Sequence, residues 1–360
     1  MSLTITGMGT SVPPRVALQA EAAELAPRFC QADRKQARIL RALYRKSGVQ
    51  QRHTVAVRGD SGPLEERIPY YPLARDSEDL GPTTRQRMAW YEQEAPPLAV
   101  EACRTALARA ETSPSEITHL VTVSCTGFFS PGVDAALIDQ LGLERAVERT
   151  HVGFMGCHGA LNGLRAASAY ALDPAARVLL CAVELCSLHF AYGWDPEMLV
   201  ANTLFADGAA ALVGRGGGGP GWRVRASGTF LMPDSVNAMT WRIGDHGFRM
   251  TLSPQVPERI RQHLADWLGS WLAHHGFGLD DVASWAVHPG GPRILDAVEA
   301  SLELDPADLA VSREILRTHG NMSSPTVLFI LERMMQQNRA RPCVALAFGP
   351  GLVVEAALIV

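Results

Sequence analysis

The sequence predicts an α/β fold in which the same order of strands and helices occurs twice. The chain has 360 residues, the length of two domains or of one duplicated fold, and 47% of them are hydrophobic, which is enough for a large core. Apolar runs of strand length are nearly continuous, as at 118–127, and such runs are typical of strands covered on both faces. They alternate with segments of helical spacing on both sides of a glycine-rich segment at 215–221. We therefore expect sheets with helices on both faces.

In the first half, a strand at 3–10 is followed by helical spacing that continues to Lys46. Residues 57–90 are polar and rich in Pro and Gly, so we expect a long surface loop there. Strands and helices then alternate. The predicted helices are 95–110, 131–143 and 160–172, and the predicted strands are 118–127, 149–156, 176–184 and 204–214.

The second half repeats this order. The predicted helices are 257–276, 292–302 and 323–337, and the predicted strands are 222–232, 283–288 and two strands within 343–360. The segment 343–360 has about the length of a membrane span, but a Gly-Pro-Gly turn at 349–351 and Glu355 interrupt it, so we expect two buried strands instead. The glycine run at 215–221 lies between two strands and opens no helix, which favours a connector over a phosphate-binding loop.

Charge and composition exclude several classes of function. The formal charge is −4, without the basic excess that nucleic acids or anionic membranes attract. The only lysines are Lys35 and Lys46, in one early helical stretch, so Schiff-base and pyridoxal-phosphate chemistry are not expected. The first residues lack the pattern of a secretory signal. Seven cysteines at irregular spacing, with no C-x-x-C pair, indicate reduced thiols in a cytoplasm rather than disulfides or zinc.

Three residues have sequence contexts that suit chemistry. Cys157 follows a strand at the start of a helix, where the helix dipole favours the thiolate. His288 ends a strand and is followed by Pro-Gly-Gly, at the edge of a sheet. Asn321 precedes a helix that Ser323 or Ser324 could cap. No metal-ligand spacing and no G-x-S-x-G motif occur.

The sequence around these residues resembles the type III polyketide synthases, the chalcone synthase-like family of the thiolase fold. The motifs that carry the resemblance are GCHGALNGL, HPGGPRILDAV and GNMSSPTVLFILE, in that order, together with LFADGAAALVG, AFGPGL and the Pro-Gly of FFSPGVD. They cover most of the chain beyond about residue 40.

The resemblance implies a thiolase-like, five-layered αβαβα core built from two similar halves. Residues 1–214 would carry the nucleophilic cysteine and residues 222–360 the histidine and asparagine. Cys157 would be acylated by a starter acyl-CoA. His288 and Asn321 would bind the thioester carbonyl of malonyl-CoA and stabilise the enolate formed on decarboxylation, so that a Claisen condensation follows, and the histidine would also pair with the thiolate. The family resemblance further implies a homodimer and no cofactor other than the coenzyme A thioesters.

Other positions follow from the same resemblance. Phe205 matches one of two phenylalanines at the tunnel mouth, and Met250 replaces the second. Lys46 matches a basic residue that contacts the coenzyme A phosphates, with Arg41 and Arg45 as further candidates. The remaining substrate-binding positions are Cys125 and His189, where threonines stand in plant chalcone synthase, Ser323, and Gly349 and Pro350 of the AFGPG loop. The more apolar Cys125 and the flexible Met250 favour an aliphatic starter and a pyrone or resorcinol-type product, whereas the bulky His189 could shorten the cavity or orient a carbonyl for cyclisation.

Two alternatives remain at this point. A ketoacyl-acyl-carrier-protein synthase III shares the fold and the Cys, His and Asn set, but has a His-Gln-Ala-Asn signature where this chain has His-Pro-Gly-Gly at 288–291. A non-catalytic thiolase-fold partner that only binds acyl groups would not need an intact set.

Overall fold

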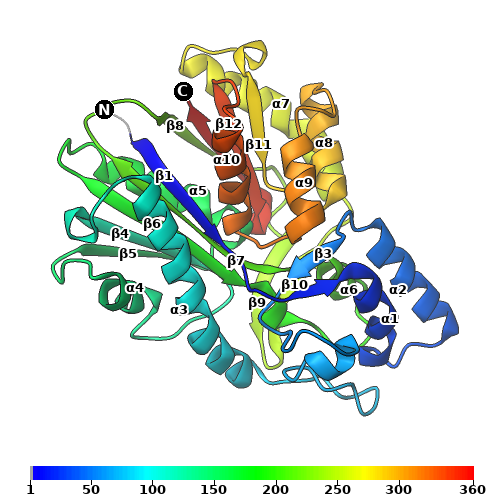
Figure 1. Ribbon diagram of the computed structural model, residues 1–360. Helices are drawn as coiled ribbons and strands as arrows, with labels where there is room; N and C mark the ends of the chain where they lie inside the picture. The colour runs from blue at the N-terminus through cyan, green and yellow to red at the C-terminus, as the bar shows by residue number, and fades with distance from the viewer. Residues whose placement is uncertain (1–2) are drawn as a thin grey trace.

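The computed structural model describes residues 3–360 and contains one large mixed sheet covered by helices (Figure 1). Nine strands of the described chain are hydrogen-bonded in the order β11-β12-β13-β8-β1-β7-β6-β4-β5. The strands are β1 Thr4–Ser11, β2 Val16–Leu18, β3 Gln51–His53, β4 His119–Ser124, β5 Glu148–Gly153, β6 Arg177–Leu185, β7 Asp207–Arg215, β8 Trp222–Leu231, β9 Met239–Gly244, β10 Gly247–Leu252, β11 Ser284–Val287, β12 Cys343–Gly349 and β13 Val353–Ile359. Two short sheets, β2–β3 and β9–β10, complete them.

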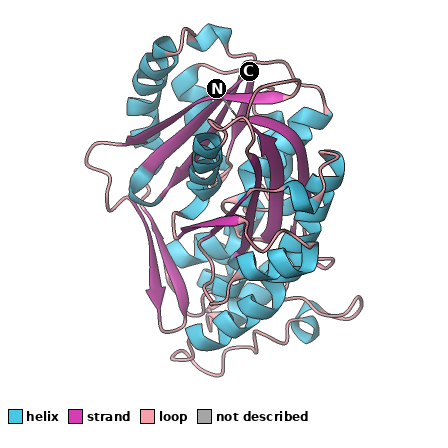
Figure 2. Cartoon of the chain, turned by 90° about the vertical axis from the view of Figure 1, so that its left-hand side faces the viewer, coloured by secondary structure: helices cyan, strands magenta, loops and turns pink. Residues whose placement is uncertain are grey.

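The helices lie on both sides of the strands, as Figure 2 shows. They are α1 Gln19–Phe29, α2 Arg34–Lys46, α3 Thr84–Arg109, α4 Val133–Leu141, α5 Gly159–Tyr170, α6 Pro196–Leu204, α7 Val256–His274, α8 Pro292–Leu302, α9 Ala310–His319 and α10 Pro325–Gln336. None of the helices between residues 3 and 360 has both the length and the hydropathy needed to cross a bilayer.

The two halves of the sheet have the same topology. In the first half, β4 is parallel to β6, β6 is antiparallel to β7, and β7 is antiparallel to β1. In the second half, β11 is parallel to β12, β12 is antiparallel to β13, and β13 is antiparallel to β8. The repeated order predicted from the sequence is therefore present as a repeated strand arrangement.

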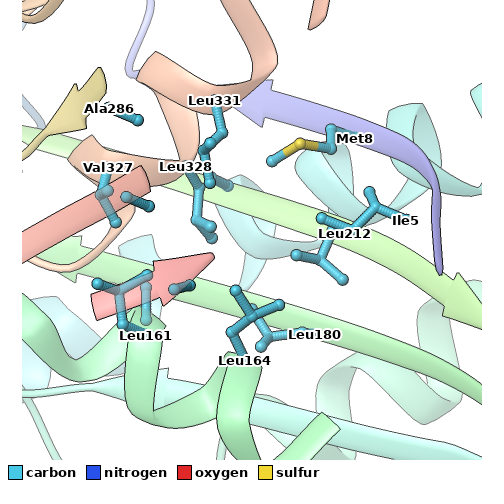
Figure 3. Close-up of a cluster of buried hydrophobic side chains, with 14 of the residues drawn as sticks. Ile5, Met8, Leu161, Leu164, Leu180, Leu212, Ala286, Val327, Leu328 and Leu331 are labelled. Carbon is cyan, nitrogen blue, oxygen red and sulfur yellow. The ribbon is translucent and has the colours of Figure 1, made fainter. Parts of the chain in front are cut away.

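The three largest clusters of buried side chains define five layers. The outer clusters join α3 and α4 to the first half of the sheet, and α7 and α8 to the second half. The central cluster joins both halves through α5 and α10, and Figure 3 shows it. Its labelled members are Ile5, Met8, Leu161, Leu164, Leu180, Leu212, Ala286, Val327, Leu328 and Leu331. This confirms the predicted thiolase-like αβαβα core.

The halves meet at β1 and β8, which pair only at Thr4–Arg223 and Ile5–Trp222. The two ends of the described chain lie at this junction. The N–H of Val224 donates to the carbonyl of Leu3, and the N–H of Arg223 donates to the carbonyl of Val360.

The expected surface loop at 57–90 is partly wrong. The helix α3 already begins at Thr84, where Thr83 and Gln86 form a reciprocal capping box, and it continues through Pro96 and Pro97. Val57 and Tyr71 within the loop are buried against α1, so the loop also carries part of a small core. The helices α6 and α9, the β9–β10 hairpin and the short strands β2 and β3 were not predicted from the sequence.

Candidate active site

Cys157 lies in a short 3₁₀ turn, Gly156–His158, between β5 and α5. Gly156 has a φ of 72°, and a Cβ atom there would lie 2.4 Å from Cδ of Pro350. Only glycine therefore lets the loop after β12, from the second half, approach the turn that carries the thiol. Gly349 packs in the same way against the ring of His158, since a Cβ atom there would lie 2.2 Å from the ring.

Asn321 and Ser323 come to the thiol from the start of α10. The side-chain Oδ1 of Asn321 accepts the N–H of Ser323 at 2.8 Å, so its Nδ2 remains as a hydrogen-bond donor. The hydroxyl of Ser323 donates to Sγ of Cys157 at 3.5 Å. Ser323 has a φ of 56°, a left-handed conformation that is strained for serine.

The predicted side-chain cap of this helix is wrong. Ser324 is the N-cap residue, but its side chain makes no capping hydrogen bond. Its hydroxyl donates instead to the buried carboxylate of Glu184 at 2.6 Å.

Glu184 fastens the two halves together beneath the site. Its carboxylate also accepts from the backbone N–H groups of Cys125 and Thr126 and from the hydroxyls of Ser124 and Thr126. Burial raises the pKa of this carboxyl, while these donors act in the opposite direction. Glu184 was not predicted as a site residue, because a glutamate inside a strand gives no local signal of such a role.

His288 follows β11 directly and is buried, with 1% of its surface exposed. Neither ring nitrogen has a hydrogen-bond partner within residues 3–360. A buried polar group without a partner is costly unless a ligand supplies one. The imidazole thus keeps hydrogen-bonding capacity that no described protein group uses.

Burial opposes charge on both reacting groups. It raises the pKa of the Cys157 thiol to about 11, although the hydrogen bonds from Ser323 and Asn321 lower it. Burial, together with the nearby His158, lowers the pKa of His288 to about 3. Both shifts favour a neutral thiol and a neutral imidazole in the resting site, so they do not support the expected thiolate and its ion pair with histidine.

Most of the predicted residues surround one cavity of about 40 Å³, which we call the reaction cavity. The predicted residues that line it are Cys125, Cys157, Phe205, Met250, Asn321, Ser323 and Pro350. Several other lining residues were not predicted, and most of them belong to the β9–β10 hairpin: Met239, Thr240, Trp241, Leu252, Gly290, Ile294 and Phe348.

A second space of about 630 Å³ lies next to the reaction cavity, and we call it the access channel. The two share Leu252, Gly290 and Ile294. The channel is lined by the exposed cations Lys46 and Arg293, neither of which has an ion-pair partner among the described residues. Arg293 belongs to the HPGGPRILDAV motif but was not singled out.

Arg41 and Arg45 do not line the access channel. Arg41 pairs instead with Glu24 of α1, at 2.8 Å. Both arginines lie on faces of α2 other than the one that carries Lys46, because one helical turn takes 3.6 residues. The structure thus does not bring these two candidates to the predicted site.

His189 holds three segments together. Its Nε2–H donates to the carbonyl of Thr126 at 2.7 Å, and its Nδ1 accepts the N–H of Phe248 at 2.9 Å, an arrangement that defines the tautomer. The ring stacks on Phe248 with centroids 4.1 Å apart. Because both nitrogens are used, the expected contact with a substrate carbonyl is wrong. His189 lines a third, apolar cavity next to the reaction cavity.

Cys125 is buried, and its Sγ lies 3.4 Å from Oγ of Ser323. A chain of contacts therefore runs from Cys125 through Ser323 to Cys157. Within residues 3–360, no group of three or more His, Cys, Asp or Glu side chains is arranged to hold a metal ion.

Comparison with known proteins covers nearly the whole sequence. The family model for the N-terminal domain of chalcone and stilbene synthases matches residues 2–217, and the model for their C-terminal domain matches residues 223–360. The chain is 35% identical to 1,3,6,8-tetrahydroxynaphthalene synthase of Streptomyces peucetius subsp. caesius, over 99% of this chain and 92% of that protein. It is 33% identical to the alpha-pyrone synthesis polyketide synthase-like Pks18 of Mycobacterium tuberculosis, over 98% and 90%. The crystal structure of PKS-I from the brown alga Ectocarpus siliculosus superposes with a TM-score of 0.91 at 32% identity, covering 99% of this chain and 98% of that one.

Proposed function

The chain belongs to the chalcone and stilbene synthase family of type III polyketide synthases, and we propose that Cys157, His288 and Asn321 carry out its chemistry. As a member of this family it condenses an acyl-CoA starter with malonyl-CoA, which sets aside the ketoacyl synthase and non-catalytic alternatives. The observation that best supports the three assignments is the buried imidazole of His288, because neither of its nitrogens has a hydrogen-bond partner among the described residues. The side chain of Asn321 adds a hydrogen-bond donor at the thiol itself.

In the first step, Sγ of Cys157 attacks the thioester carbonyl of the starter. A new bond forms between this sulfur and the acyl carbon, the bond between the acyl carbon and the coenzyme A sulfur breaks, and the thiol proton passes to the departing coenzyme A. His288 stays neutral at neutral pH, because burial lowers its pKa to about 3, and its ring N–H can hydrogen-bond to the oxyanion that forms on the attacked carbonyl.

In the second step, malonyl-CoA loses CO₂, and the electron pair of the broken C–C bond forms an enolate on the remaining thioester. The donors of Asn321 and His288 hydrogen-bond to its oxygen, which carries the developing negative charge. The enolate carbon then attacks the acyl group on Cys157, a C–C bond forms, and the Cys157 sulfur leaves and is protonated. A buried site favours these donors because water does not compete with them.

Intact-protein mass spectrometry and CO₂ release test the assignment. We expect an acyl adduct on the unaltered enzyme after incubation with acyl-CoA and none on Cys157→Ala. Removing one such donor typically slows a reaction by about 10²–10³-fold, so the double variant His288→Ala/Asn321→Ala should lose malonyl-CoA decarboxylation while keeping its thiol. An adduct that persists in Cys157→Ala, or normal decarboxylation by the double variant, would refute these roles.

The rim of the access channel supports coenzyme A binding there. Lys46 and Arg293 are exposed at the channel, where their charges would meet the phosphates of coenzyme A. All seven cysteines are free, which supports a reducing compartment such as the cytoplasm. No cofactor beyond the thioester substrates is proposed.

The chain would act as a homodimer. β5 ends the sheet as an edge strand, and the large apolar side chains of Phe128 and Met155 are about 40% exposed near it (41% and 39%). An unpaired strand edge beside an apolar patch is a surface that a second copy can cover. Sedimentation at micromolar concentration should give twice the chain mass.

For the starter we propose an aliphatic acyl group and for the product a pyrone or resorcinol-type ring. The reaction cavity supports this, because Cys125, Met250 and Ile294 give it flexible, apolar walls.

A further inference from the structure

His158 follows the nucleophile directly in the sequence and has no role in the chemistry described so far. Its side chain is buried, with 2% of the residue's surface exposed, and it lines neither the reaction cavity nor the access channel. The ring packs instead on the backbone of Gly349 at the end of β12. Any effect of this ring on the reaction must therefore pass through its neighbours.

Hydrogen bonds lead from His158 to a buried carboxylate. Nδ1 of His158 lies 2.7 Å from Oδ1 of Asn162, and Nδ2 of Asn162 donates to Oε1 of Glu355 at 3.0 Å. Because Nδ2 is bound to the carboxylate, Oδ1 acts as the acceptor, and His158 carries its hydrogen on Nδ1. Burial lowers the pKa of His158, while Asn162 and Glu355 act in the opposite direction, so the ring is neutral at pH 7. We call His158, Asn162 and Glu355 the support chain.

The support chain crosses from one half of the molecule to the other. Asn162 belongs to α5 of the first half, and Glu355 belongs to β13 of the second half. Glu355 also pairs with Arg165 of α5 and accepts the hydroxyl of Thr229 of β8 at 2.8 Å. Glu184 of β6 binds the start of α10 in a similar way. Each half thus presents a buried carboxylate to the central helix of the other half.

The strand β12 connects the support chain with the second reacting group. The backbone N–H of His288 donates to the carbonyl of Leu346 on β12 at 2.8 Å. Three residues further along the same strand, Gly349 contacts the ring of His158. Burial and then His158 lower the pKa of His288, so the two rings are close enough for their charges to interact. The position of the turn that carries Cys157 relative to His288 therefore depends on how His158 rests on β12.

We propose that His158 is a positioning residue: the support chain holds its ring against β12, and this contact fixes the distance between the sulfur of Cys157 and the imidazole of His288. The inference rests on the proposed function, since the distance matters only if both groups act on one substrate. Loss of the support chain should lower kcat and leave KM unchanged, because a displaced reacting group slows the chemical step while the cations at the access channel stay in place.

Two substitutions of unchanged side-chain shape test the support chain. Asn162→Leu and Thr229→Val each remove one donor to Oε1 of Glu355, but only Asn162→Leu also removes the partner of His158. For malonyl-CoA decarboxylation, Asn162→Leu should lower kcat roughly three- to tenfold, the effect of about one hydrogen bond, and keep KM within about twofold. Thr229→Val is the matched control and should keep both constants within about twofold. Both rates are expressed per thiol that iodoacetamide labels, so that unfolded protein recognised by circular dichroism can be excluded.

A second pair of variants changes His158 itself. Asparagine and leucine have the same shape, but an asparagine amide can occupy the place of Nδ1 and donate to Asn162. His158→Asn and His158→Leu both lose the ring, so both should be slower than the unaltered enzyme. The kcat of His158→Asn should nevertheless exceed that of His158→Leu roughly two- to tenfold. This pair decides the question if Asn162→Leu fails to fold.

The outcomes separate the inference from the function on which it rests. The inference is overturned if Asn162→Leu keeps its kcat within twofold, if Thr229→Val loses as much, or if the two His158 variants have equal kcat. His158 would then only fill space beside β12. If His288→Ala keeps the decarboxylation rate of the unaltered enzyme, the proposed function fails instead, because the distance to His288 would have no bearing on the reaction.

Discussion

Ser323 combines two tasks in a single strained residue. Its backbone N–H fixes the amide of Asn321, and its hydroxyl contacts the sulfur of Cys157. A non-glycine residue in the left-handed region costs on the order of 1–3 kcal/mol, and such strain persists only where the surroundings enforce it. The conformation lets one residue orient both the nucleophile and a donor for the enolate.

Replacing Ser323 by Ala should make the thiol less reactive. The change removes the hydroxyl that stabilises the anionic sulfur and keeps the N–H that orients Asn321, so the pKa of Cys157 should rise further above its usual value. One such hydrogen bond contributes about 0.5–1.5 kcal/mol, which corresponds to a roughly two- to tenfold slower alkylation of Cys157 by iodoacetamide at a given pH. Rates measured across pH 7–10 check this.

Ser324→Ala serves as the comparison, because its hydroxyl binds Glu184 and makes no hydrogen bond to the thiol. It should not slow the alkylation. An alkylation rate of Ser323→Ala equal to that of the unaltered enzyme would show that the hydroxyl does not stabilise the thiolate.

At the scale of elements, His189 joins the 3₁₀ turn Cys186–His189 to the segment after β4 and to β10. Arg87 of α3 reinforces the same turn, since its guanidinium donates to the carbonyls of Leu188 and Phe190 on either side of the histidine. The hairpin that lines the reaction cavity is thereby fixed to the first half of the molecule.

This arrangement gives the stability a defined pH dependence. Burial lowers the pKa of His189 to about 3 in the folded chain, against about 6.5 for an unperturbed histidine, so the unfolded chain binds the additional proton between these values. The free energy of unfolding therefore falls as pH falls from 6.5 toward 3, by up to about 1.4 kcal/mol per pH unit for this group. At pH 5 the loss amounts to about 2 kcal/mol relative to pH 7.

Urea unfolding of the unaltered enzyme and of His189→Gln at pH 7, 6 and 5 measures this term. Glutamine does not titrate, so the variant should be less stable at pH 7 but lose less stability on acidification. Equal slopes for the two proteins would mean that His189 already carries its proton when folded.

The sequence predicted the elements that carry the layered core better than those that shape the site. Strands such as β4 and β6 are covered on both faces, so burial alone imposes an apolar run that can be read directly. The β9–β10 hairpin lies outside the layers and contains arginines and threonines between its apolar residues, so it gave no such signal. The start of α3 at Thr84 was missed because its first turns are polar and continue the loop-like stretch before them. Pro96 and Pro97, which come later in the same helix, also argued against a helix there.

The same distinction applies to the candidate site. Cys157, His288 and Asn321 lie in turns that need particular residues. The positive φ of Gly156, for example, requires a glycine, and this glycine can be recognised in the sequence. The third, apolar cavity that His189 lines depends on how α1 packs against α6 and the turn that ends in His189, which lie far apart in the chain. Helical spacing alone could not show that Arg41 pairs with Glu24 on a neighbouring helix.

At the scale of the whole molecule, the reaction cavity lies where the two halves meet. The first half supplies Cys157 at the start of α5, and the second supplies Asn321 at the start of α10, the two helices of the central layer. The nucleophile and an enolate donor thus come from the N-terminal ends of α5 and α10, which occupy equivalent places in the two halves. Neither half alone contains a complete site.

The junction of β1 and β8 also means that the order of the halves along the polypeptide can be exchanged. Leu3 and Val360 both lie against β8, so a short linker can join the two ends, and new ends can be opened in the glycine-rich connector at 216–221. A circular permutant that runs from the second half into the first should fold with the same far-ultraviolet circular dichroism spectrum and keep malonyl-CoA decarboxylation within about tenfold. Loss of both would mean that the original chain order is required for assembly. If both persist, the two halves can be varied as separate cassettes, one carrying the nucleophile and the other the enolate donors.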